Sequence, residues 1–160
     1  MQVTTIGLDL AKNIFQVHGV REDGSVAFNR PVRRAQLLNF FKKQSPCLVG
    51  MEACGSSHYW GRELTKLGHD VRLMAPVYVK PYVKRGKSDA ADAEAICEAV
   101  TRPTMRFVPI KSVEQQGVLT QHRVRELLIR QRTQLSNNIR ALVGEFGYII
   151  RKGVYYIRDF

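Results

Sequence analysis

Apolar and polar residues follow a strand-like pattern over the first half of the chain. Five stretches show alternating or short apolar runs bounded by turn residues: 3–10, 13–20, 25–32, 47–53 and 69–76. Two stretches between them carry apolar residues at helical spacing: 33–44 and 55–68. This order predicts an α/β fold in which an antiparallel meander of three strands precedes parallel crossovers.

The second half of the chain has the pattern of helices. A shorter helix is predicted over 88–101, with Ser88 as its N-cap. Residues 112–147 contain no proline and predict one long helix with an apolar stripe spaced by threes, fours and a seven. The stripe consists of Val124, Leu128, Leu135, Ile139, Leu142 and Phe146. It is typical of a coiled-coil or helix-hairpin seam, so we expect this helix to project and to associate with a partner.

Composition narrows the class of protein. The chain has 160 residues, is 44% hydrophobic and carries a formal net charge of +11, which together indicate a globular protein with a polyanionic partner. No apolar run approaches the roughly 20 residues of a membrane span, and no signal peptide is visible, so we expect a cytoplasmic protein without a membrane partner. Cys47, Cys54 and Cys97 lack metal-ligand spacing and are expected to be buried free thiols.

A basic segment at 77–87 interleaves two tyrosines with cations and contains no acid. Its cations are Lys80, Lys84, Arg85 and Lys87. Such a segment suits tracking of a nucleic-acid backbone, although a solvated basic loop has the same composition. Four cations elsewhere are also expected to contact nucleic acid: Lys12, Arg123, Arg130 and Arg132.

Two aspartates, Asp89 and Asp92, stand three residues apart at the start of the helix predicted over 88–101. Residues at this spacing are neighbours on a helix, and two like charges there repel unless a cation lies between them. For Asp89 alone, a favourable interaction with the helix N-terminus is an equally good explanation.

Two more carboxylates occur where a sheet would bury them. Asp9 lies in the first predicted strand, and Glu52 ends the fourth. If these strands are neighbours, their acids can meet, and the helix at 88–101 can present its two aspartates to them. Four carboxylates without histidine or cysteine favour Mg²⁺ or Mn²⁺, and two such ions about 3.5–4 Å apart suit phosphodiester chemistry.

Three motifs occur in order, GLDLAKN at 7–13, GMEACGSSHYW at 50–60 and KSDAADAEAI at 87–96, before a long helix that ends in RALVGEFG. Over residues 4–147 the chain thereby resembles the DEDD transposases of the IS110 family, bridge-RNA-guided recombinases of bacterial insertion sequences. The resemblance implies a ribonuclease-H-like (RuvC-like) fold with a mixed five-stranded sheet flanked by helices, then a coiled-coil helix. It also implies a catalytic tetrad that binds two Mg²⁺ or Mn²⁺ ions: Asp9, Glu52, Asp89 and Asp92.

The resemblance further implies a domain plan: a RuvC-like domain at 1–111, a coiled-coil helix at 112–147 and the start of a linker at 148–160. In the family a C-terminal transposase domain with a serine nucleophile completes a composite active site, and this chain has no counterpart of it. The implied activity is DNA strand cleavage and exchange during transposition, in the bacterial cytoplasm. The implied partners are DNA, a structured guide RNA and further copies of the chain, as a dimer or tetramer through the long helix.

Three other functions stay open at this point. A standalone RuvC-like nuclease would need the same four acids, and the isolated chain would cut branched DNA. A nucleotide-binding domain of the actin and sugar-kinase type would bind ATP, but Ala11 and Asn13 stand where that fold uses glycine and threonine. A non-catalytic module that binds RNA and dimerises would tolerate alanine at all four acids.

Overall fold

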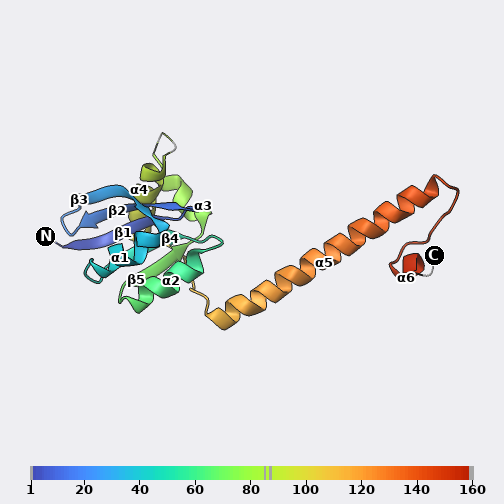
Figure 1. Cartoon of the computed structure of the whole chain (residues 1–160). Coiled ribbons are helices and arrows are strands. Elements are labelled where there is room, and N and C mark those ends of the chain that lie inside the picture. Colours follow the sequence, from blue (N-terminus) through green and yellow to red (C-terminus); the bar gives the residue numbers. More distant parts are fainter. Residues whose placement is uncertain (1, 85, 87, 159–160) are drawn as a thin grey trace. The chain divides into compact units, whose positions relative to one another are not determined.

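The structure is a computed structural model that describes residues 2–84, 86 and 88–158 and divides into two compact units (Figure 1). The first unit, Met1–Ser112, is built on a mixed sheet with the strand order β3-β2-β1-β4-β5-β6. The strands are β1 (Val3–Asp9), β2 (Ile14–Arg21), β3 (Val26–Arg33), β4 (Leu48–Glu52), β5 (Asp70–Met74) and β6 (Phe107–Val108). β1, β2 and β3 form the antiparallel meander, while β4 and β5 run parallel to β1.

The five strands predicted from the sequence are all present in the predicted chain order, and β1 and β4 are neighbours. The sheet has six strands rather than the predicted five, because β6 pairs antiparallel with β5. β6 has only 2 residues, which is too short for an alternating pattern to show in the sequence. With helices on both faces, this is the ribonuclease-H-like α/β fold that the motifs implied.

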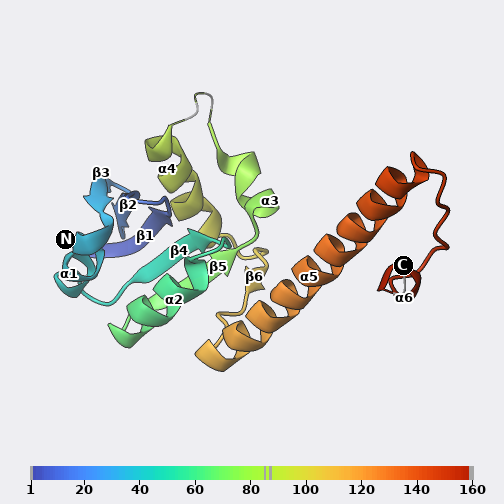
Figure 2. The ribbon, with the colours of Figure 1, turned by 45° about the vertical axis from the view of Figure 1, so that its right-hand side comes forward.

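Helices cover both faces of the sheet (Figure 2). They are α1 (Leu37–Lys42), α2 (Ser57–Lys66), α3 (Pro76–Val79) and α4 (Asp89–Val100), with short 3-10 turns η1 (Arg34–Gln36) and η2 (Lys80–Tyr82). On the side of α1 and α2, Phe15 and Leu64 belong to the larger core cluster. On the side of α3 and α4, Met74, Val79 and Ile96 belong to a second, smaller cluster.

α4 lies directly on the sheet because two residues beneath it have no side chain. Gly7 and Gly50 are paired across β1 and β4. A Cβ atom at Gly7 would lie 2.1 Å from the carbonyl oxygen of Ala93, and one at Gly50 would lie 2.7 Å from the Cβ of Val100. The two glycines therefore set the distance between α4 and the sheet.

The basic segment at 77–87 is partly helical, which the sequence analysis did not predict, and this corrects the alternative of a plain solvated loop for its first part. Residues 76–82 form α3 and η2, and Pro76 stands in the first turn of α3, where its missing N–H leaves no bond unmade. Val79 is buried and Tyr82 packs against the cluster on the α4 side. These apolar anchors were hidden in the sequence by the lysines around them.

The second unit, Val113–Phe160, consists of α5 (Val113–Gly144) and the short α6 (Tyr155–Arg158) with an irregular segment between them. The predicted long helix is confirmed, although it ends at Gly144 rather than at 147. Arg140 donates hydrogen bonds from Nε to the carbonyl of Arg151 (3.1 Å) and from Nη2 to that of Gly153 (2.7 Å). Of the helices that the structure describes, none is long and apolar enough to cross a membrane.

Candidate metal-binding active site

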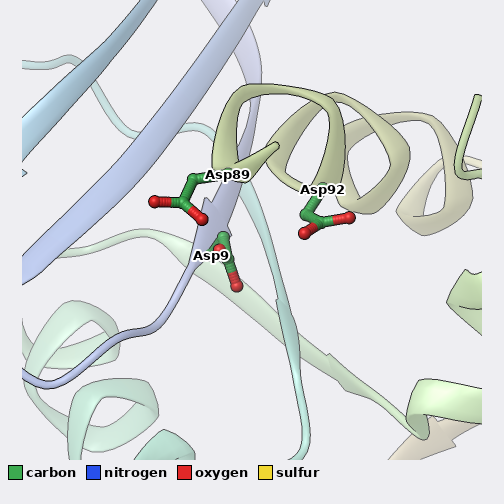
Figure 3. A group of neighbouring side chains, drawn as sticks. All are labelled: Asp9, Asp89 and Asp92. Carbon is green, nitrogen blue, oxygen red and sulfur yellow. The ribbon is translucent and has the colours of Figure 1, made fainter. Parts of the chain in front are cut away.

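Three of the four predicted acids come together at the sheet edge where β1 ends (Figure 3). Asp9 is the last residue of β1, and Asp89 and Asp92 stand in the first turn of α4. Each side chain offers one carboxylate oxygen, and the three oxygens lie within 4.8 Å of one another. Asp9 and Asp92 are half-buried, whereas Asp89 is exposed.

Local chemistry at the start of α4 explains how its two aspartates are placed. Ser88 is the N-cap, as predicted, and its Oγ accepts a hydrogen bond from the backbone N–H of Ala91 at 3.2 Å. The cap starts the helix at Asp89, so the spacing of three puts Asp92 on the same side. Because Ser88 supplies the cap, Asp89 is not needed for it.

Glu52 stands at the margin of the aspartate group. Leu8 pairs with Met51 in the parallel β1–β4 ladder, so the next residues, Asp9 and Glu52, end neighbouring strands. Glu52 is not one of the three acids whose oxygens meet, but its half-buried carboxyl group is within electrostatic reach of Asp9 and Asp92. Burial, followed by the charges of Asp9 and Asp92, raises the pKa of Glu52.

Among the described residues, no basic side chain neutralises the charges of the cluster. Burial, followed by the charges of Asp92 and Asp89, raises the pKa of Asp9 as well. In the part of the chain that the structure describes, no lysine, arginine or histidine lies within ion-pair distance of Asp9, Glu52, Asp89 or Asp92. A bound cation would relieve this repulsion, and a donor set made only of carboxylate oxygens fits a hard divalent ion.

A pair of amides that the sequence analysis missed holds the first turn of α4. Asn29 of β3 donates from Nδ2 to the carbonyl oxygen of Ala90 at 3.2 Å. Gln16 of β2 donates in turn from Nε2 to Oδ1 of Asn29 at 2.7 Å. Gln16 is also the strand partner of Asp9, so the amide pair borders the acid cluster. Its only sequence signal was polar residues at alternate strand positions, which any half-exposed strand shows.

The cations predicted to contact nucleic acid differ in their surroundings. In the first unit, Lys12 and Lys80 are exposed, whereas Lys84 forms an ion pair with Glu94 at 2.5 Å. Arg85 and Lys87 lie outside the described residues. On α5, Arg123, Arg130 and Arg132 are exposed, and Arg130 lies 3.7 Å from Glu126.

The cysteines are free, and two of them are buried as predicted. Burial raises the pKa of Cys47 to about 11 and that of Cys97 to about 12, so both thiols stay protonated at neutral pH. Cys54 is exposed, which corrects the prediction that it is buried. It lies in the loop between β4 and α2, where the chain leaves the sheet.

Several curated proteins are similar to this chain. The "Probable family 20 transposase" of Pseudomonas aeruginosa is 61% identical over 93% of this chain and 44% of its own length. The "Putative transposase y4pF/y4sB" of Sinorhizobium fredii is 50% identical over 96% of this chain and 40% of its own length. The "Transposase for insertion sequence element IS1111A" of Coxiella burnetii is 42% identical, with coverages of 94% and 42%. The chain thus spans less than half the length of these relatives.

A solved structure, "T. thermophilus RuvC in complex with Holliday junction substrate", aligns with 68% of this chain and all of its own at a TM-score of 0.48 and 13% identity. The match to a family profile covers a larger part of this chain than that structural alignment does. The profile of the IS110 DEDD family, described as "Transposase", matches residues 6–147. The chain belongs to the DEDD transposase family of the IS110 insertion sequences.

Proposed function

We propose that this chain is the DEDD half of an RNA-guided transposase and takes part in metal-dependent cleavage and exchange of DNA strands during transposition of an insertion sequence. One observation carries the proposal. Asp9, Asp89 and Asp92 meet at a sheet edge, without a cationic partner among the described residues, in a chain of this transposase family.

In this proposal Asp9, Asp89 and Asp92, with Glu52 as the fourth acid, hold Mg²⁺ or Mn²⁺, as two ions. Bound divalent ions supply electrostatic stabilisation of the attacking and leaving oxygens in phosphodiester chemistry. The protein contributes by fixing where its carboxylates stand. β1 holds Asp9, and the capped first turn of α4 holds Asp89 and Asp92.

The raised pKa values of Asp9 and Glu52 give the site a pH dependence. A metal ligand must be deprotonated, so protons compete with the cation for these two carboxyl groups. We therefore expect metal affinity to increase as the pH rises through the folded-state pKa values of the two acids.

The domain plan of the whole protein is part of the proposal. Residues 1–111 act as the RuvC-like domain, 112–147 as the coiled-coil segment, and 148–160 as the start of a linker to a C-terminal transposase domain. The support for a larger protein is that the chain covers 44%, 40% and 42% of the lengths of three curated relatives.

The proposed partners are target DNA, a structured guide RNA and further copies of the chain. Net charge of +11 supports a nucleic-acid partner, and the exposed cations on α5 support contact along that helix. Exposed leucines on α5, with Leu128 at 58% and Leu135 at 61%, support assembly into a dimer or tetramer through this helix.

The metal site is tested by thermal unfolding of the 160-residue chain with and without Mn²⁺. A ligand that binds only the folded state stabilises it, by about 2.7 kcal/mol at 100 times its Kd. We expect Mn²⁺ to raise the Tm of the wild type, and Asp89→Asn to reduce that rise without lowering the Tm of the metal-free chain. Glu63→Gln, which removes an acid of α2 paired with Lys66, is the matched control and should keep the full response.

Equal metal responses of the wild type and Asp89→Asn would show that the acid cluster is not a metal site. In the full-length parent protein, alanine at each of the four acids should abolish strand cleavage and leave nucleic-acid binding intact. Full activity of those variants would instead favour the non-catalytic RNA-binding module.

A further inference from the structure

A second group of charges, all positive, lies around the loop that follows Asp9 and on the α1 and α2 side of β3. Arg34 begins η1 directly after β3 and is exposed. Its backbone N–H donates to the carbonyl of Asn13 at 2.8 Å, and its Nη1 donates to the carbonyl of Lys12 at 3.4 Å. Both carbonyls belong to the loop that joins Asp9 to β2, so Arg34 is fastened to the loop that leaves the candidate site.

The guanidinium of Arg34 is held over two aromatic rings. Its central carbon lies 5.2 Å from the ring centre of Trp60 and 5.6 Å from that of Phe15. These rings pack edge to face at 5.3 Å, and both Phe15 and Trp60 are buried. A guanidinium over aromatic faces is held in place while the N–H groups at its rim stay available to other acceptors.

Arg30, four residues earlier in the chain, is held in a similar way. It is exposed on β3, and its guanidinium carbon lies 5.2 Å from the ring centre of Phe40. Val32, between the two arginines, is buried on the same face as Phe15. Arg30 and Arg34 therefore form a row along the outer strand of the sheet, which leads toward the loop containing Lys12.

The row lacks acidic partners, whereas two other arginines of the first unit, Arg72 and Arg102, have them. Arg72 is paired with Asp70 at 2.8 Å, and Arg102 is paired with Glu98. In the described part of the chain, no carboxylate lies within ion-pair distance of Arg30, Arg34 or Lys12. Exposed, preorganised and unpaired cations around the loop that leaves Asp9 match the charge of a phosphodiester backbone.

An aromatic surface accompanies the cations. Tyr59 is 45% exposed and packs edge to face on Trp60 with ring centres 5.0 Å apart. An exposed ring next to phosphate-binding cations is the usual arrangement for stacking on an unpaired base. α2, which carries both rings, begins just after the loop that follows Glu52.

We propose that Arg30, Arg34 and Lys12 form a phosphate-binding row, with Tyr59 as a stacking surface, that guides a DNA strand to the acid cluster. This inference rests on the proposed function, because a strand-cutting site needs a path for its substrate. The row uses neither the basic segment at 77–87 nor the arginines of α5.

The test is binding of a fluorescently labelled DNA by the full 160-residue chain in EDTA, as a function of salt. Arg34→Gln and Arg30→Gln should each weaken binding about five- to tenfold at 0.1 M salt. Each should also reduce the slope of log K against log salt by about 0.9 on duplex DNA, or about 0.7 on a single strand. Arg72→Gln and Arg102→Gln remove the same charge from paired arginines and should change binding much less. Tyr59→Ala should weaken binding to single-stranded DNA more than binding to a duplex.

Each of the following three outcomes would contradict the proposed phosphate-binding row. Equal losses in the paired and unpaired arginine variants would mean that only net charge matters. An effect of Arg34→Gln on an RNA of the same sequence, with none on DNA, would make this an RNA surface. A third outcome is that Arg34→Gln loses both DNA binding and the Mn²⁺-dependent rise in Tm, while Arg30→Gln binds DNA normally. Arg34 would then only support the Lys12 loop.

The two proposals can fail separately. Binding in EDTA does not depend on a metal, so an absent Mn²⁺ response in the wild type would refute the metal site and leave the binding result to be judged by itself. If Asp89→Asn loses the Mn²⁺ response as expected, but neither arginine variant changes DNA binding, the phosphate-binding row alone is refuted.

Discussion

The two units of this chain handle their apolar side chains in opposite ways. In the first unit, Leu8, Phe41 and Leu64 are fully buried, and two core clusters cover both faces of the sheet. In the second, α5 leaves Leu128 and Leu135 more than half exposed. A sheet with helices on both sides buries its own core, whereas a single long helix has no surface of its own to bury its stripe against. The first unit is therefore expected to owe its stability to its own packing, and the second to depend on a partner.

The largest contrast should come from the same substitution made in each unit. Gly7→Ala would place a Cβ 2.1 Å from the Ala93 carbonyl oxygen, whereas a Cβ at Gly117 of α5 would meet nothing within 4 Å. We expect Gly7→Ala to lower the free energy of unfolding by about 4 kcal/mol or more. Gly117→Ala should raise the stability of α5 by about 0.5–1 kcal/mol. Urea unfolding followed by circular dichroism measures both changes in stability. A small loss of stability in Gly7→Ala would mean that α4 is not held tightly on the sheet.

A leucine truncated in each unit gives a smaller contrast. Leu64 is 0% exposed and Leu135 is 61% exposed. Leu64→Ala should cost about 3 kcal/mol, through lost burial and the cavity left behind. Leu135→Ala should change the stability of the dilute chain little and should lower its tendency to associate. Unfolding at low concentration and sedimentation at high concentration separate the two effects, and association unaffected by Leu135→Ala would contradict a role for the stripe.

The amide pair Gln16 and Asn29 tests how firmly the first turn of α4 is held within the first unit. Asn29→Ala removes the hydrogen bond to the Ala90 carbonyl and should cost about 1 kcal/mol. It should also weaken the Mn²⁺-dependent rise in Tm, because the first turn of α4 is less well held. Asn39→Ala, at an exposed position of α1, is the control and should change neither quantity.

The smallest expected effect is a pH dependence that belongs to the acid cluster. The folded state raises the pKa of Asp9 above 3.8 and that of Glu52 above 4.5, so it holds their protons more tightly than the unfolded chain does. Their contribution to stability is present below these values and is lost as the pH rises through the folded-state pKa values. In EDTA, Asp9→Asn should therefore gain stability relative to the wild type between about pH 4 and pH 7. A constant difference across this range, in parallel urea titrations, would contradict the repulsion.

The sequence was sufficient to predict features that leave a pattern in residues close together along the chain. Alternation predicted the five longer strands, and the three-residue spacing of Asp89 and Asp92, with Ser88 before them, predicted the capped pair. The meeting of these acids with Asp9 followed once the first and fourth strands were taken as neighbours. Glu52 was expected as an equal member, but side-chain reach, which strand order does not determine, leaves it at the margin.

Other features depend on contacts between distant segments and left no trace in the pattern. Nothing in the pattern marks Gly7 as the residue on which α4 packs. Arg34 looked like any surface arginine, because its two rings come from β2 and α2, far away in sequence. The helical turns at 76–82 were obscured because Lys80 and Lys84, close in sequence to Val79 and Tyr82, suggested solvent exposure rather than packing.

The pair of glycines under α4 also has a genetic consequence. A non-synonymous single-base change in a glycine codon introduces a residue that has a Cβ, or else a stop codon. At position 7 that atom would meet the backbone of α4, and at position 50 it would meet Val100. In a saturation-mutagenesis library selected for transposition, the codons for Gly7 and Gly50 should therefore tolerate synonymous changes only. An insertion sequence that drifts without selection would be inactivated readily through either codon, even with every acid of the cluster still encoded.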